Sequence, residues 1–136
     1  YTECISDVEE ELINKFLPGL MTIILKKNEK ISSLICNGGD YVGIRIPDNK
    51  DLIDIINKLG RPVISTSANI SDNDVITRVD MIDEELLKNI DYVEDGGEVI
   101  SLSSSVVRIV DDELVVLREG KLSDDIKAYY MANLKK

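Results

Sequence analysis

The sequence predicts an α/β (α+β) domain in which helices flank an open, twisted, mixed β-sheet. Short apolar segments typical of strands alternate along the chain with segments whose apolar residues recur at helical spacing. Near the C-terminal end, two strand-like segments joined by a short bend indicate an antiparallel hairpin that closes the sheet. The chain has 136 residues, of which 43% are hydrophobic, which is enough for a single domain over residues 1–136 with a core of its own.

The first helix is predicted from a capping box, because Ser6 is followed three residues later by Glu9. Apolar residues then recur on one helical face: Val8, Leu12, Ile13 and Phe16. Pro18 and Gly19 end this helix, and residues 20–27 are expected to form a mostly buried strand.

The next segments repeat this alternation. Residues 37–40 have the composition of a turn, and residues 41–46 are expected to form a strand. A second helix begins around residues 47–49 and ends at Gly60. Its apolar face consists of Leu52, Ile55, Ile56 and Leu59.

The second half of the chain predicts two short strands, at residues 62–65 and 92–94, with a third helix capped by Asp80 between them. Residues 106–110 and 114–117 form the clearest hairpin, with Asp111 and Asp112 at the bend. Ser123 is expected to cap a final helix through Leu134.

Composition excludes several classes of function. The chain has no histidine, which removes histidine-based triads and histidine-ligated zinc. Its net charge of −10 opposes tight binding of duplex nucleic acid, of RNA or of an acidic membrane, but it allows a small anion held by one or two arginines. No segment resembles a signal peptide or a membrane span. Cys4 and Cys36 are expected to be buried or half-buried free thiols in a reducing, cytoplasmic compartment.

Two arginines are candidates for binding an anion. Alternation along residues 41–46 puts Arg45 on the same face as Gly43, with open space above the glycine, where a guanidinium can bind a carboxylate or a phosphate. An arginine that extends outward to solvent or pairs with an aspartate or glutamate explains Arg45 equally well. Arg118 ends the last strand and is either an anion ligand or the partner of Glu119. Arg108 is expected to face outward from the hairpin.

Two polar clusters lie at the ends of predicted strands. The stretch RPVISTSANISD, residues 61–72, has more hydroxyl and amide groups than a turn or a helix cap requires, which favours a binding site at Ser65 to Asn69. A second cluster, residues 103–105, precedes the hairpin. Ligands in open α/β sheets bind in crevices at strand ends.

Five segments together resemble one protein family. They are LPGLMTIIL (residues 17–25), VGIRIPD (residues 42–48), STSANIS (residues 65–71), SSVV (residues 104–107) and LREG (residues 117–120). Their order and spacing resemble those of the YrdC-like threonylcarbamoyl-adenylate synthases, whose domain is a YrdC/RibB-like open twisted sheet with flanking helices. The family's N-terminal T-x-T-x-Y-G-L and K-x-R segments do not occur in this chain. The resemblance therefore implies a YrdC-like domain that is N-terminally incomplete.

The resemblance implies an enzyme that joins L-threonine, bicarbonate or CO2, and ATP into threonylcarbamoyl-AMP and pyrophosphate, with Mg²⁺ accompanying ATP. The product serves a downstream transferase complex that makes threonylcarbamoyladenosine at position 37 of tRNA. The implied threonine-binding residues are Arg45, Ser65, Thr66 and Ser105. The implied residues for ATP and its phosphates are Thr22, Ser67, Asn69 and Arg118.

No catalytic nucleophile is implied, because threonine carbamate itself attacks the α-phosphorus. Whether this chain is active without the N-terminal segments is left open. Two alternatives stand beside the synthase: a relative that forms carbamoyl-adenylate, and a non-catalytic YrdC-like protein that binds a nucleotide or RNA.

Overall fold

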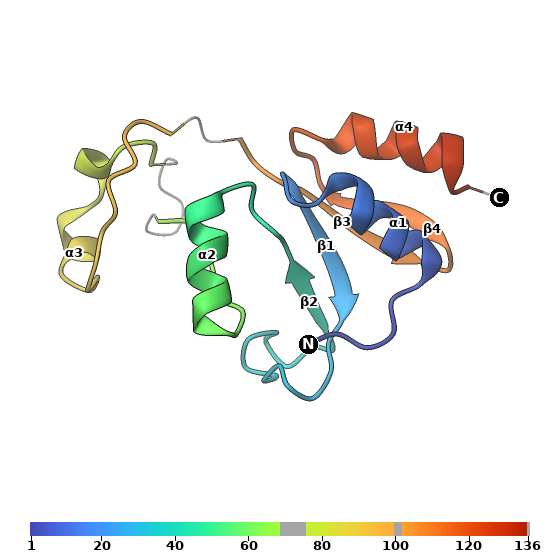
Figure 1. Ribbon diagram of the computed structural model, residues 1–136, viewed down its shortest axis with the longest axis horizontal. Helices are drawn as coiled ribbons and strands as arrows, with labels where there is room; N and C mark the ends of the chain where they lie inside the picture. Colours follow the sequence, from blue (N-terminus) through green and yellow to red (C-terminus); the bar gives the residue numbers. More distant parts are fainter. Residues whose placement is uncertain (69–75, 100–101, 136) are drawn as a thin grey trace. The chain divides into compact units, whose positions relative to one another are not determined.

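The computed structural model describes residues 1–68, 76–99 and 102–135 (Figure 1). The chain divides into two compact units. The first, called unit 1, contains Tyr1–Leu59 and Leu102–Lys136, and the second, unit 2, contains Gly60–Ser101. The prediction of one domain over residues 1–136 stays a prediction, and each unit is described by itself below.

Unit 1 is built on a four-stranded sheet of order β2-β1-β3-β4. The strands are β1 (Met21–Lys26), β2 (Tyr41–Ile44), β3 (Ser105–Val110) and β4 (Glu113–Arg118). β1 and β3 run parallel, whereas the pairs β1–β2 and β3–β4 are antiparallel, so the predicted mixed sheet is confirmed. The hairpin bends at Asp111 and Asp112, whose φ angles are 50° and 62°. Positive φ at both central residues is typical of a type I′ turn, whose twist matches that of the two flanking strands.

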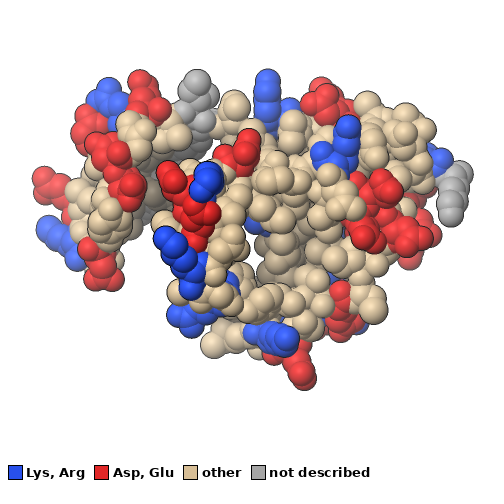
Figure 2. Space-filling view, viewed as in Figure 1, with Lys and Arg blue, Asp and Glu red and all other residues tan. Residues whose placement is uncertain are grey.

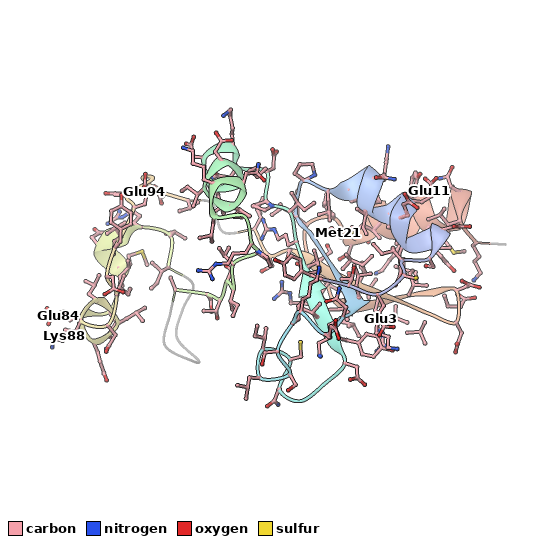
Figure 3. All side chains as sticks on the ribbon, turned by 60° about the horizontal axis from the view of Figure 1, so that its bottom comes forward. Glu3, Glu11, Met21, Glu84, Lys88 and Glu94 are labelled. Carbon is pink, nitrogen blue, oxygen red and sulfur yellow. The ribbon has the colours of Figure 1, made fainter. Side chains whose placement is uncertain are left out.

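Helices α1 (Asp7–Phe16) and α4 (Ser123–Asn133) cover one face of this sheet (Figure 1). The predicted capping box is present: Ser6 Oγ accepts from the Glu9 backbone N–H, and the Glu9 carboxylate accepts from the Ser6 N–H. Glu11 lies on α1 (Figure 3), and its carboxylate accepts a hydrogen bond from the Tyr129 hydroxyl of α4 at 3.3 Å. The buried core between helices and sheet consists of Leu12, Met21, Ile23, Leu25, Val107 and Ile126.

Alternation along the strands gives the sheet two distinct faces. Met21, Ile23 and Leu25 point into the core, and the strand register places Ser105 and Val107 beside them. The opposite face, called the outer face below, faces away from α1 and α4. The register assigns to it Thr22, Ile24, Tyr41, Gly43, Val106, Arg108 and Arg118.

The second helix of unit 1, α2 (Lys50–Leu59), begins where the sequence predicted. The Asn49 side chain accepts a hydrogen bond from the Leu52 N–H at 2.9 Å, and Gly60 follows the helix with a φ of 69°. No residue of α2 is buried, and Leu52, Ile55 and Leu59 are 38%, 57% and 45% exposed. Three residues of the predicted apolar face of this helix are therefore exposed, and the fourth, Ile56, is half-buried.

The final helix begins at Ser123, but this residue does not cap it as predicted. Ser123 is buried, and its hydroxyl accepts from the Gly120 N–H at 2.8 Å and lies 3.0 Å from the Ser105 hydroxyl. The side chain thus links the start of α4 to β3 instead of binding the first N–H groups of its own helix. Gly120 packs so closely on residues 103–105 that a Cβ there would lie 2.4 Å from the Ser105 nitrogen.

Unit 2 contains two short helices, η1 (Val79–Met81) and α3 (Glu84–Leu87). The cap of α3 is Asp83, which accepts from the Glu85 N–H, and not Asp80, whose carboxylate pairs with Arg78. Glu84 and Lys88 project from this part of the chain, and Glu94 from the segment that follows (Figure 3). None of the described residues of unit 2 is buried.

The strands predicted at residues 62–65 and 92–94 are wrong, because neither segment is a strand. Val63 and Ile64 are 45% and 76% exposed, and Tyr92 is 77% exposed. A strand needs a partner for its backbone hydrogen bonds, and an apolar segment of three or four residues does not specify one.

Both cysteines are free thiols. Cys36 is half-buried as expected, but Cys4 is exposed, because it lies in the N-terminal segment outside the core. Within residues 1–68, 76–99 and 102–135, every helix is too short or too polar to cross a membrane.

Candidate anion-binding site

The side chain of Arg118, at the end of β4, is held in place by the residue that precedes β3. Its Nη2 donates to the Ser104 hydroxyl at 2.8 Å and to the Ser104 carbonyl oxygen at 3.0 Å, and its Nε donates to the same carbonyl at 3.2 Å. Ser104 is 5% exposed, whereas Arg118 is exposed. An anchored guanidinium that stays open to solvent can bind a carboxylate or a phosphate with little loss of side-chain entropy.

A second hydroxyl completes this cluster. Thr22 Oγ1, on β1, lies 3.0 Å from Ser104 Oγ. Thr22, Ser104 and Arg118 therefore join three separate segments of the chain at one end of the outer face, the end where the parallel strands β1 and β3 begin. Two hydroxyls beside a guanidinium are donors suited to anionic oxygens.

Ser105, the residue assigned to threonine by the sequence, points the other way. It is fully buried, and its hydroxyl accepts from the Leu122 N–H at 3.1 Å and contacts Ser123. Ser104 is the polar residue that the sequence reasoning missed. Alternation would have found it: Val107 belongs to the core, so Ser105 shares its face and Ser104 does not.

The prediction for Arg118 left open a pairing with Glu119, and the structure pairs Glu119 differently. The Glu119 carboxylate accepts from Lys127 Nζ of α4 at 2.6 Å. This hydrogen bond lowers the pKa of Glu119 below its ordinary value, and the same pair raises the pKa of Lys127. Glu119 therefore leaves the Arg118 guanidinium to its contacts with Ser104.

Arg45 lies one residue beyond the end of β2 and is exposed. Its Nε donates to the Gly19 carbonyl oxygen at 3.0 Å, and the Gly19 N–H donates to the Ile46 carbonyl at 2.8 Å. One edge of the guanidinium is thereby fixed against the loop before β1. The acid that could have paired with Arg45 is not found among the described residues.

Gly43 is exposed, but its neighbours on β1 come close to it. A Cβ at Gly43 would lie 3.2 Å from Thr22 Cγ2 and 3.3 Å from Ile24 Cδ1. The absence of a side chain lets these two neighbours on β1 lie over the backbone of β2. Gly43 therefore lets two side chains of β1 pack closely on the outer face.

Arg108, on β3, faces away from the core as expected, but it is half-buried instead of solvated. Its guanidinium carbon lies 3.7 Å from the centre of the Tyr41 ring.

The serine-rich stretch lies in unit 2, where Ser65, Thr66 and Ser67 are exposed and in no regular element. Asn69 lies outside the described residues. The structure therefore brings Thr22, Ser104 and Arg118 together in unit 1. Ser65, Thr66 and Ser67 belong to unit 2.

On the face in Figure 2, acidic and basic side chains are interleaved, and acidic groups gather around the α3 segment of unit 2. In the part of the chain that the structure describes, no group of three or more cysteine, aspartate or glutamate side chains could hold a metal ion.

Comparisons with known proteins agree with this fold. The model of the Sua5/YciO/YrdC family, which carries the description "Telomere recombination", matches residues 1–120. A Methanocaldococcus jannaschii protein that is provisionally named as a threonylcarbamoyl-AMP synthase is 45% identical over 118 residues, which are 85% of this chain and 54% of that protein. The threonylcarbamoyl-AMP synthase of Pyrococcus abyssi is 33% identical over 119 residues, which are 87% of this chain and 35% of the relative.

Two solved structures are also similar. P. abyssi Sua5 complexed with L-threonine has a TM-score of 0.86 and 29% identity, and the match covers 99% of this chain and 40% of that one. E. coli YciO has a TM-score of 0.78 and 26% identity, with 90% and 61% covered. This chain spans about half the length of the M. jannaschii relative and about a third of the P. abyssi one. Since the family model covers most of its residues, the chain belongs to the Sua5/YciO/YrdC family.

Proposed function

We propose that this chain takes part in the synthesis of threonylcarbamoyl-AMP from L-threonine, bicarbonate or CO2, and ATP, with release of pyrophosphate. The observation that carries the proposal is the cluster of Thr22, Ser104 and Arg118, an anchored guanidinium beside two hydroxyls. The names of the relatives support the reaction, and the L-threonine complex of P. abyssi Sua5 supports the amino-acid substrate.

The chemistry requires no protein nucleophile. The amine of threonine captures CO2 to give a carbamate, and a carbamate oxygen then forms a bond to the α-phosphorus of ATP while the bond to pyrophosphate breaks. The protein has to hold two anions close together and stabilise the charge that develops on the phosphoryl oxygens. A chain without histidine is able to do this with arginines and hydroxyls.

Within this proposal, Arg118 and Thr22 contact the phosphates of ATP, and Arg45 binds the threonine carboxylate. Ser104 orients the Arg118 guanidinium, and the Ser105 hydroxyl, which the motif assigned to threonine, is buried on the core side. Ser65 and Thr66 are assigned to the amino acid, and Ser67 and Asn69 to the phosphate and carbamate groups, on the sequence motif alone.

Mg²⁺ does not fit the described cluster as a protein-held ion. Proteins bind Mg²⁺ through one or two carboxylates together with substrate phosphates, and Thr22, Ser104 and Arg118 include no carboxylate. We therefore assign no step to a metal held by these residues. Mg²⁺ enters the proposal as the companion of ATP.

Downstream, threonylcarbamoyl-AMP is a reactive mixed anhydride that must pass to a transferase acting on tRNA. The chain's net charge of −10 supports handing on a small adenylate instead of holding tRNA tightly. The cytoplasm, where tRNA is modified, is the proposed location.

The test measures pyrophosphate release by the 136-residue chain with ATP, L-threonine and bicarbonate, omitting each in turn. The proposal predicts release that requires all three, together with saturable binding of ATP and of L-threonine. ATP hydrolysis that is indifferent to threonine would contradict it. Turnover that depends on carbamoyl phosphate would favour a carbamoyl-adenylate-forming relative, and RNA binding without ATP or threonine binding would favour a non-catalytic protein.

A further inference from the structure

Arg108 is a cationic residue of the outer face that the proposed function does not use. The register pairs Thr22 with Val106 and Val106 with Arg118, so Arg108, two residues further along β3, points to the same side of the sheet. Two residues of strand advance about 7 Å. Arg108 and Arg118 therefore lie on the same face of the sheet. Their positions differ by about 7 Å along the strand direction, a distance comparable to the length of a short chain of phosphates.

The Arg108 side chain contacts the aromatic ring of Tyr41, but its Nε has no hydrogen-bond acceptor among the described residues. Its guanidinium carbon lies 3.7 Å from the centroid of the Tyr41 ring, a close cation–π contact. Its Nε is buried and makes no hydrogen bond within the described residues. None of the ion pairs among those residues includes Arg108, although the chain has 26 acidic side chains.

A purely structural role accounts for only part of this arrangement. The stack ties β3 to β2 across the intervening strand β1, which an apolar side chain of similar length could do equally well. A charged group left without a partner is costly, and buried polar groups in native proteins usually have one. A guanidinium stacked on a ring, with a buried Nε that has no hydrogen-bond partner among the described residues and with no ion pair, is instead suited to an external anion at its outer nitrogens.

We propose that Arg108, oriented by Tyr41, is a second cationic ligand for the phosphate chain of the nucleotide, next to Arg118. This rests on the proposed function, because it assumes that a nucleotide binds on the outer face. Arg118 is held by Ser104 and Arg108 by an aromatic ring, so both guanidinium groups are positioned before the ligand arrives. Such positioning reduces the entropy lost when a flexible polyanion is bound.

The experiment titrates ATP, pyrophosphate and L-threonine separately into the 136-residue chain by calorimetry and compares variants. Arg108→Met is expected to weaken binding of ATP and of pyrophosphate by about tenfold or more, the effect of losing a charged hydrogen bond. The affinity for L-threonine and the Tm should stay unchanged. Arg108→Lys, which keeps the charge, should restore part of the loss.

Arg78→Met is the matched control. It removes the same side chain and the same charge, but Arg78 is already paired with Asp80 in unit 2. If Arg108→Met does not fold, Arg108→Gln, which is neutral and polar, provides the same comparison.

Equal affinity for ATP and pyrophosphate in the wild type and the neutral variants would overturn the inference and leave the stack a structural feature. A loss of threonine binding of the same size would overturn it as well. A wild-type chain that binds neither ATP nor pyrophosphate would refute the proposed function first, and this inference with it.

Discussion

At the residue scale, two adjacent serines have opposite surroundings. Ser104 precedes β3 and contacts Arg118 and Thr22, whereas Ser105 begins the strand and contacts Leu122 and Ser123. The sequence motif alone cannot tell them apart, because both are serines at the end of the same strand. The difference comes from the alternation of side chains once the strand has neighbours.

Substitution of each serine should separate binding from stability. Ser104→Ala removes the hydroxyl that Arg118 Nη2 binds, so ATP affinity should fall by about tenfold with little change in stability. Ser105→Ala leaves the Leu122 N–H without its acceptor, so the free energy of unfolding should fall by about 1–3 kcal/mol while affinity is kept. Calorimetry and urea denaturation measure the two effects. The assignment of Ser104 fails if both variants bind ATP like the wild type.

At the element scale, the ion pair between Glu119 and Lys127 joins the end of β4 to helix α4. The pKa of Glu119 is lowered in the folded chain, chiefly by the hydrogen bond from Lys127. A lowered carboxyl pKa contributes stability that is present above the unfolded pKa and is lost as pH falls through the folded pKa. The pair also raises the pKa of Lys127, so its contribution is lost again in strongly alkaline solution.

Glu119→Gln should therefore lower the Tm slightly at neutral pH, and the difference from the wild type should vanish as pH falls below about 4.5. Thermal denaturation followed by circular dichroism between pH 7 and pH 3 checks this. Glu113→Gln is a suitable comparison, since its contact with Lys135 spans 3.7 Å and should have a smaller effect. A Tm difference that stays constant with pH would show that the pair is not its cause.

Elements differed in how well the sequence predicted them. The capping box at Ser6, the hairpin turn at Asp111 and Asp112, and the stop at Gly60 are local signals, and the structure has all three. The strands expected at residues 62–65 and 92–94 needed a distant partner, and the sequence contains no local signal for one. Local hydrogen bonds are therefore predictable here, whereas strand pairing is not.

At the scale of the whole molecule, the buried core belongs almost entirely to unit 1. Helices α1 and α4 contribute Leu12 and Ile126 to a cluster with residues of β1 and β3, and both are fully buried. The described residues of unit 2 include none that is buried. Cooperative unfolding should therefore report mainly on the sheet and these two helices.

Ile126→Ala should lower the free energy of unfolding by about 2–5 kcal/mol, because it removes a fully buried side chain and leaves a cavity. Met131→Ala, in the same helix but 60% exposed, should change it by less than about 0.5 kcal/mol. Urea denaturation of both variants measures the difference. If both variants lost a similar free energy of unfolding, α4 would not pack on the sheet through the side that carries Ile126.

The sequence by itself determined the fold class, the positions of α1, α2 and the hairpin, and the family. Helix caps, turns and short family motifs are formed by residues that are neighbours in the sequence. It also selected Thr22, Arg45 and Arg118 as candidates. Only the tertiary structure decided that Ser104 and not Ser105 accompanies Arg118, that Glu119 pairs with Lys127, and that Arg108 stacks on Tyr41. Each of these contacts joins segments that lie on different strands or helices, and their geometry exists only after the sheet has set the register between them.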